Sequence, residues 1–177
     1  MTADTLKMEP LVEDGWALAT PRDVDIQELM SWFPTADSVD IWSGPRFRYP
    51  FTGTSFRDDC RIDDIQSFCL KNPDGVLVAF GQLYDRHDRA HLARLITRPN
   101  SRRKGIGQRL ICMLMNAAQR ISNYSEYSLF VYRHNEAAYR CYLAMGFVLQ
   151  DYPDDAPMKD KCLFLTRHRP QAGAEPH

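Results

Sequence analysis

The sequence predicts one domain of the mixed α/β class, and three observations lead to this. The 177 residues, 44% of them hydrophobic, fit a single domain with its own core. Segments with strand character alternate with segments of helical character along the chain. One strand runs through a basic, glycine-containing turn, RPNSRRKGIGQRL, directly into an apolar helix. We expect the domain to cover residues 12–168, with residues 1–11 and 169–177 as flexible tails.

Before this turn, capping and breaker residues indicate the elements. Thr20 can cap a helix whose first residue is Pro21, because proline suits the first helical position. Glycine and proline residues interrupt regular structure over residues 43–56. The predicted order is a strand at 16–20, a helix ending near residue 32, the irregular segment, a helix within 58–70, a turn at 72–75, and strands at 76–83 and 90–98.

After the turn, the pattern predicts two helices and three strands. Asn135 is a good N-cap, and Gly146 can end a helix in the left-handed conformation that glycine adopts most easily. The predicted elements are a helix at 106–120, a strand at 128–132, a helix between Asn135 and Gly146, and a closing β-hairpin of residues 147–150 and 161–167.

Composition excludes several classes of function. A formal net charge of −1 argues against a general nucleic-acid-binding or membrane-surface protein. No apolar run approaches the ~20 residues of a membrane span, and the N-terminus does not read as a secretory signal. The five cysteines are odd in number and lack CxxC spacing, which favours reduced thiols in a cytoplasmic protein without a metal site.

Positive charge is concentrated around the basic turn, because residues 92–120 contain seven basic residues and no acid. The first N–H groups of a helix lack intrahelical partners, and Gly105 and Gly107 carry no side chain to shield them. A compact phosphate ligand fits this arrangement, with a solvated basic loop as the alternative. Spacing excludes a P-loop, since Gln108 and Arg109 follow Gly107, and also a dinucleotide fingerprint, whose third glycine is replaced by Leu110.

Two motifs together resemble the GNAT superfamily of acetyl-CoA-dependent N-acetyltransferases. The segment Arg102–Gly107, Arg-x-x-Gly-x-Gly, is similar to the family's pyrophosphate loop. The segment Asn135–Phe147, with Ala138, Tyr142 and Gly146, is similar to its second signature. The resemblance covers residues 75–167 well and the first 70 loosely. It implies a mostly antiparallel sheet that is splayed at the cofactor site and flanked by helices.

The resemblance also implies roles for individual residues. Acetyl-CoA is the expected cosubstrate, and Tyr142 is the expected acid that protonates the departing thiolate. From periodicity alone, Tyr142 could instead belong to a core-facing stripe with Tyr139. The implied cofactor-binding residues are Leu95, Ile96, Thr97, Arg102, Arg103, Lys104, Gly105, Ile106, Gly107, Gln108 and Asn135.

One position departs from the pattern of some relatives. Those that acetylate ribosomal-protein N-termini carry a glutamate base five residues before the motif asparagine, where this chain has Phe130. His91 is the candidate base, because other relatives place a glutamate at its position and its ordinary pKa is near 6.5. Strand alternation would put His91, Leu95 and Thr97 on one face. The alternative is a strand histidine without a catalytic role.

The acceptor wall is expected from the irregular segment. Its aromatic residues could line a pocket for an amine with an apolar portion, or could simply close the core. The candidate substrate-binding residues are Trp42, Phe47, Tyr49 and Phe51.

The sequence therefore predicts an N-acetyltransferase that moves the acetyl group of acetyl-CoA to a primary amine of a small molecule or peptide. A CoA-binding sensor or interaction module without turnover is the runner-up. Nucleic-acid binding is a weaker alternative because the basic residues gather at one turn. The expected partners are acetyl-CoA and an amine, without nucleic acid or membrane, and a homodimer is compatible with the sequence.

Overall fold

The computed structural model describes residues 8–170, in which one eight-stranded sheet has the order β1-β2-β3-β4-β5-β6-β8-β7. All neighbouring strands are antiparallel except β5 and β6, which run parallel. This confirms the mixed, mostly antiparallel fold. The strands are β1 (Leu11–Glu13), β2 (Trp16–Ala19), β3 (Gln66–Lys71), β4 (Leu77–Arg86), β5 (Arg89–Thr97), β6 (Glu126–Tyr132), β7 (Val148–Gln150) and β8 (Cys162–His168).

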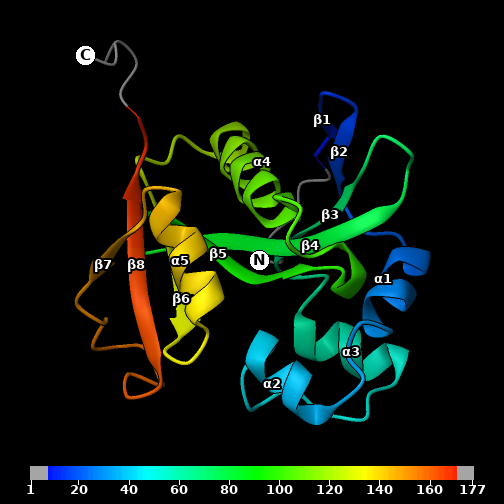
Figure 1. The fold of residues 1–177 in the computed structure, drawn as a ribbon, viewed down its shortest axis with the longest axis horizontal. Helices are drawn as coiled ribbons and strands as arrows, with labels where there is room; N and C mark the ends of the chain where they lie inside the picture. Colours follow the sequence, from blue (N-terminus) through cyan, green and yellow to red (C-terminus); the bar gives the residue numbers. More distant parts are fainter. Residues whose placement is uncertain (1–7, 171–177) are drawn as a thin grey trace.

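Helices cover both faces of this sheet (Figure 1). The long helix α4 and the shorter α5 pack on one face, while α1, α2 and α3 gather below the other. Within residues 8–170 no helix combines the length and apolarity needed to cross a membrane. The helices are α1 (Asp23–Met30), α2 (Ala36–Ser43), α3 (Gly53–Cys60), α4 (Ile106–Ile121) and α5 (Glu136–Ala144), with one turn of 3-10 helix at Pro99–Ser101.

The buried apolar side chains form two cores, one on each face. The larger core joins the sheet to α4, with Leu110, Met113 and Leu114 fully buried. The smaller core joins α1–α3 to the sheet around Phe56 and Phe80. The two cores hold the strands from opposite sides, so the middle of the sheet is a rigid platform for a site.

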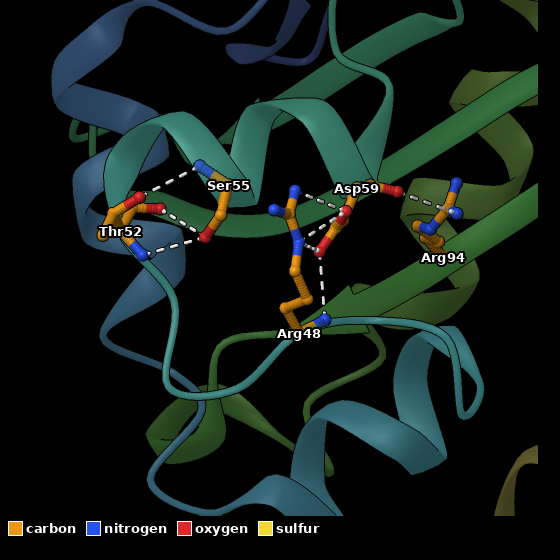
Figure 2. Close-up of polar contacts among 5 residues, drawn as sticks. All are labelled: Arg48, Thr52, Ser55, Asp59 and Arg94. Atoms are coloured by element: carbon orange, nitrogen blue, oxygen red, sulfur yellow. Dashed lines mark hydrogen bonds and ion pairs between the residues drawn. The ribbon is translucent and has the colours of Figure 1, made fainter.

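The first 70 residues differ most from the sequence-based prediction. The expected helix within 58–70 is wrong beyond Cys60, because residues 61–64 form turns and residues 66–71 form β3 between β2 and β4. Helix α3 begins earlier, at Gly53, where Thr52 and Ser55 cap each other reciprocally with hydrogen bonds of 3.1 and 2.9 Å (Figure 2). Helix α2 lies where no helix was predicted.

Two boundary predictions also change. Arg22, and not Thr20, is the N-cap of α1, and its backbone N–H donates to the Asp25 carboxylate at 2.8 Å. Of the predicted tails, residues 1–7 and 171–177 lie outside the described residues, while Leu11 begins β1 and is buried. The closing hairpin is confirmed, since β7 pairs with β8 antiparallel.

A β-bulge in β5 shapes the centre of the sheet. Between the pairs Phe80↔Ile96 and Gln82↔Ala93, β5 has two residues where β4 has one. Arg94, in this bulge, has a φ of 47°, which a residue other than glycine rarely adopts. The bulge interrupts the side-chain alternation, so residues before and after it face differently than a regular strand would predict.

Candidate active site

The site begins where β5 and β6 diverge. Their parallel pairing is limited to Ala90↔Tyr127 and His91↔Ser128, after which the strands separate. Beyond that point the edge of β5 that faces β6 has no strand partner among the described residues. A cavity of about 560 Å³ lies in this region, with walls from both faces of the sheet. The splay therefore gives side chains from opposite layers access to one space.

Several predicted site residues meet in this cavity. Its lining includes Leu95 from β5, Asn135 and Tyr142 from the start and body of α5, His91, and Trp42 from α2. These residues come from three separate segments of the chain, α2, β5 and α5, and the splay brings them together. Ile96 and Thr97 are on the same strand but are not part of the lining.

The bulge corrects the predicted facing of β5. Leu95 packs against the larger core, where a Cβ at Gly81 would lie only 2.9 Å from its Cδ2 atom. Ile96 packs against the smaller core instead. The expectation that His91, Leu95 and Thr97 share one face is wrong, because the extra residue at Arg94 reverses the alternation between them.

Of the four aromatic residues proposed for the acceptor wall, only Trp42 lines the cavity. Phe47 and Phe51 pack on Phe56 with ring centroids 5.3 and 4.9 Å away, and so close the smaller core. Tyr49 is exposed and donates its hydroxyl to the carbonyl of Pro34 at 2.9 Å. The aromatic lining comes from elsewhere in the chain: Tyr84, Phe130, Tyr132 and Tyr152.

The loop between β7 and β8, residues 151–161, forms one wall of the cavity. The sequence pattern did not predict this role for the loop. Tyr152, Pro157 and Met158 from this loop line the cavity. Asp155 ties the loop to the β4–β5 hairpin by bonds to His87 at 2.7 Å and Arg86 at 3.2 Å. The hydrogen bond with His87 lowers the pKa of Asp155, so this carboxylate is charged at neutral pH.

The basic turn lies at the N-terminus of α4. Gly105, with a φ of 75°, is the N-cap residue, and no side chain caps the helix. Arg102, Arg103 and Lys104 are exposed, whereas Arg109 packs over the ring of Trp16 at 4.7 Å. The open helix end and the exposed cations form a site that suits phosphate groups.

Helix α5 presents Asn135 and Tyr142 to the cavity. The Asn135 side chain accepts a hydrogen bond from the Ala138 N–H at 3.3 Å, which confirms it as the N-cap. Gly146 has a φ of 86° and ends the helix as predicted. Burial raises the pKa of Tyr142 above its ordinary value of 10. Its phenol therefore keeps its proton at neutral pH and is available as a donor.

His91 is buried between strands. Its side chain is 2% exposed, its Nδ1 atom lies 2.8 Å from the Ser128 hydroxyl, and its ring contacts Phe130 at 4.9 Å. Burial, and then the charge of Arg86, lower the pKa of His91 to about 3. The ordinary pKa near 6.5, on which the choice of His91 as candidate base depended, therefore does not hold in the folded chain. The ring is neutral at pH 7, and its ability to accept a full proton there is weak.

We expect the buried His91 to make the fold sensitive to acid. The unfolded chain protonates this ring near pH 6.5, whereas the folded chain does so only near 3. The contribution of the neutral His91 to the free energy of unfolding should be fully present above pH 6.5 and decrease as the pH falls toward 3. At pH 4.5 the loss should be roughly 2–3 kcal/mol. In urea unfolding, the decrease in the free energy of unfolding between pH 7.5 and 4.5 should be smaller by this amount in His91→Gln than in the wild type. The exposed His168→Gln serves as control, and equal acid sensitivity in all three proteins would contradict the assignment.

Comparison with known proteins identifies similar sequences and structures, and all those named below are acetyltransferases. The model of the acetyltransferase (GNAT) family matches residues 26–147. The PaiA N-acetyltransferase from Thermoplasma acidophilum, in complex with coenzyme A, is 16% identical, with a TM-score of 0.63 over 87% of this chain and 99% of that one. The spermidine N-acetyltransferase from Vibrio cholerae, in complex with CoA and spermine, is 17% identical, with a TM-score of 0.68 over 88% and 96%. The ribosomal-protein-S18-alanine N-acetyltransferase from Escherichia coli is 17% identical, with a TM-score of 0.58 over 92% and 99%. At these identities the structural likeness shows the fold.

Proposed function

Because the chain belongs to the GNAT acetyltransferase family, we propose that it transfers the acetyl group of acetyl-CoA to a primary amine of a small molecule or peptide. The observation that carries this proposal is the cavity where β5 and β6 diverge, which both Tyr142 and the bulged strand β5 line. The free thiols of all five cysteines suit a cytoplasmic location.

The residues present fit acetyl-CoA as cosubstrate, which supplies an acetyl thioester and leaves as a thiol. The backbone edge of β5 at Leu95, Ile96 and Thr97, which β6 does not pair, would hydrogen-bond the pantetheine arm. The uncapped N–H groups of α4 and the exposed residues of the loop 102–108 would bind its pyrophosphate. Asn135 would contact the cofactor from the start of α5, where it already lines the cavity.

The attacking amine must be neutral, but an alkyl ammonium with a pKa near 10.4 leaves only about one part in 10³ neutral at pH 7. The partly buried cavity and the guanidinium of Arg94 on its wall both disfavour a charged ammonium. His91 is too weak a base at pH 7 to hold the proton, so we assign it the end of a water chain that carries the proton out. Tyr142 donates its phenolic proton to the departing sulfur.

The test is turnover of acetyl-CoA with a panel of primary amines, read as free thiol and as the mass of the acetylated product. We expect product with at least one amine and none when the amine is omitted. Binding of CoA without turnover of any amine would favour the non-catalytic CoA-binding alternative. If neither CoA nor acetyl-CoA shifted the melting temperature, both functions would be contradicted.

A further inference from the structure

Arg94 places a positive charge on the cavity wall, and among residues 8–170 it forms no ion pair with a carboxylate. Its Nε atom donates to the Ser43 hydroxyl at 2.8 Å, and its Nη1 atom donates to the Gln82 side-chain oxygen at 2.8 Å. Its Nη2 atom reaches the backbone carbonyl of Asp59 at 3.4 Å. These three partners are all neutral, so they orient the guanidinium without cancelling its charge.

Two carboxylates in this region, those of Asp59 and Asp64, are already engaged by other arginines. The Asp59 carboxylate faces away and binds Arg48, with the closest N–O distances at 3.0 Å, while only its carbonyl faces Arg94 (Figure 2). Asp64, on the cavity wall, pairs with Arg61 at 3.7 Å. Arg61 and Asp64 offset each other, and the neutral His91 adds nothing, so Arg94 leaves the charged lining with one net positive charge.

The guanidinium is also held rigidly. Gln82, which orients it, is fully buried and is itself fixed by hydrogen bonds to the Cys60 carbonyl and the Ser67 hydroxyl, both at 2.8 Å. The backbone carbonyl of Arg94 accepts a hydrogen bond from the Trp42 indole at 2.8 Å. Three of its five N–H groups are used by the bonds to Ser43, Gln82 and Asp59, and the other two have no hydrogen-bond partner among the described residues. A guanidinium fixed in this way suits a carboxylate.

From this site we propose that the acceptor is an amine that also carries a carboxylate, in the manner of a free amino acid, and that Arg94 binds the carboxylate. The inference rests on the proposed function and names its substrate class. The aromatic lining from Trp42, Tyr84 and Tyr132 suits an apolar or aromatic side chain on the same molecule. A cavity of about 560 Å³ that must also take the acetyl-pantetheine end leaves room for an acceptor of amino-acid size.

The same charge disfavours acceptors with several ammonium groups. A polyamine would bring a second cation toward Arg94, and the lining carboxylate of Asp64 is already paired with Arg61. We therefore expect spermidine to be a poorer acceptor than an apolar amino acid. Spermidine as the better acceptor would overturn the proposal.

The experiment compares matched acceptors on the wild-type protein. Phenylalanine, phenylalaninamide and phenethylamine share the side chain, and only the first carries the carboxylate. The ammonium pKa of phenylalanine lies above that of phenylalaninamide and below that of phenethylamine. At a given pH the fraction of neutral amine is therefore higher than that of phenylalanine in one analogue and lower in the other, so it cannot explain a preference for phenylalanine over both. We expect kcat/KM for phenylalanine to exceed that of each analogue by roughly 10- to 100-fold, as loss of a hydrogen bond to a charged group predicts. The leucine, leucinamide and isopentylamine series repeats the comparison.

Substitution then assigns the preference to Arg94. Arg94→Met should bring the preference for phenylalanine down to about twofold or less while phenethylamine is still acetylated, and Arg94→Lys should keep part of it. Arg57→Met removes an arginine of α3 that pairs with Asp23 and Asp63 outside the cavity, and it should keep the wild-type preference. A full preference in Arg94→Met would overturn the assignment, and if that variant does not fold, the wild-type comparison decides alone.

The outcomes separate this inference from the proposed function. Turnover of amines without any preference for the carboxylate would overturn the inference and leave the acetyltransferase function standing. If no amine turned over, calorimetry of the CoA-bound protein would decide the inference. Binding of phenylalanine but not phenethylamine would then support it, and binding of neither or of both equally would overturn it.

Discussion

Replacing Tyr142 by phenylalanine is expected to lower kcat at least ~10²-fold while the affinity for CoA stays nearly unchanged. Burial holds the pKa of this phenol above 10, so its proton is retained throughout the neutral range. The hydroxyl acts mainly as the sulfur departs, and its loss should therefore appear in the transition state and not in cofactor binding. Steady-state kinetics with calorimetric measurement of CoA binding would show the two effects separately.

Tyr139 is the matched control on the same helix. It packs against the larger core and is not part of the cavity lining, so Tyr139→Phe should turn over at close to the wild-type rate. Because the pKa of Tyr142 is raised, we also expect no loss of wild-type activity from its ionisation as the pH rises toward 10. Wild-type turnover in Tyr142→Phe would remove this residue from the mechanism.

Replacing Gly105 by valine should abolish most of the stabilisation that CoA gives to the fold. At a ligand concentration a hundredfold above the dissociation constant, that stabilisation is about 2.7 kcal/mol. Gly105 has a φ of 75°, and a β-branched residue rarely adopts this conformation, so the turn would shift and the first N–H groups of α4 would be displaced. Thermal unfolding with and without CoA measures the loss.

Gly75 provides a control of the same kind. It has a φ of 78° in the turn before β4, and like Gly105 it has no described atom within 4 Å of an added Cβ. Gly75→Val should lower the stability of the apo-protein by a similar amount yet keep the full response to CoA. An intact CoA response in Gly105→Val would show that this turn does not bind the phosphates.

Local sequence signals were enough to predict the main elements of the second half of the chain. Basic residues, paired glycines and an apolar helix follow one strand directly, so the turn before α4 can be recognised without knowing its surroundings. The same holds for α5, because Asn135 and Gly146 define its ends through backbone conformations that these two residue types favour. Caps and turns depend on interactions within a few residues, and these can be predicted from the sequence.

Only the tertiary structure decided the acceptor side of the cavity. A bulge arises from the pairing of two strands, and nothing around Arg94 in the sequence marks the extra residue that turns Leu95 and His91 to different faces. The pKa of His91 depends on burial among strands distant in sequence, and this lowers it far below its ordinary value of 6.5. Trp42, Tyr84 and Tyr152 lie on separate elements and meet only because β5 and β6 diverge. Contacts of this kind are set by packing between elements, so the local residue pattern does little to predict them.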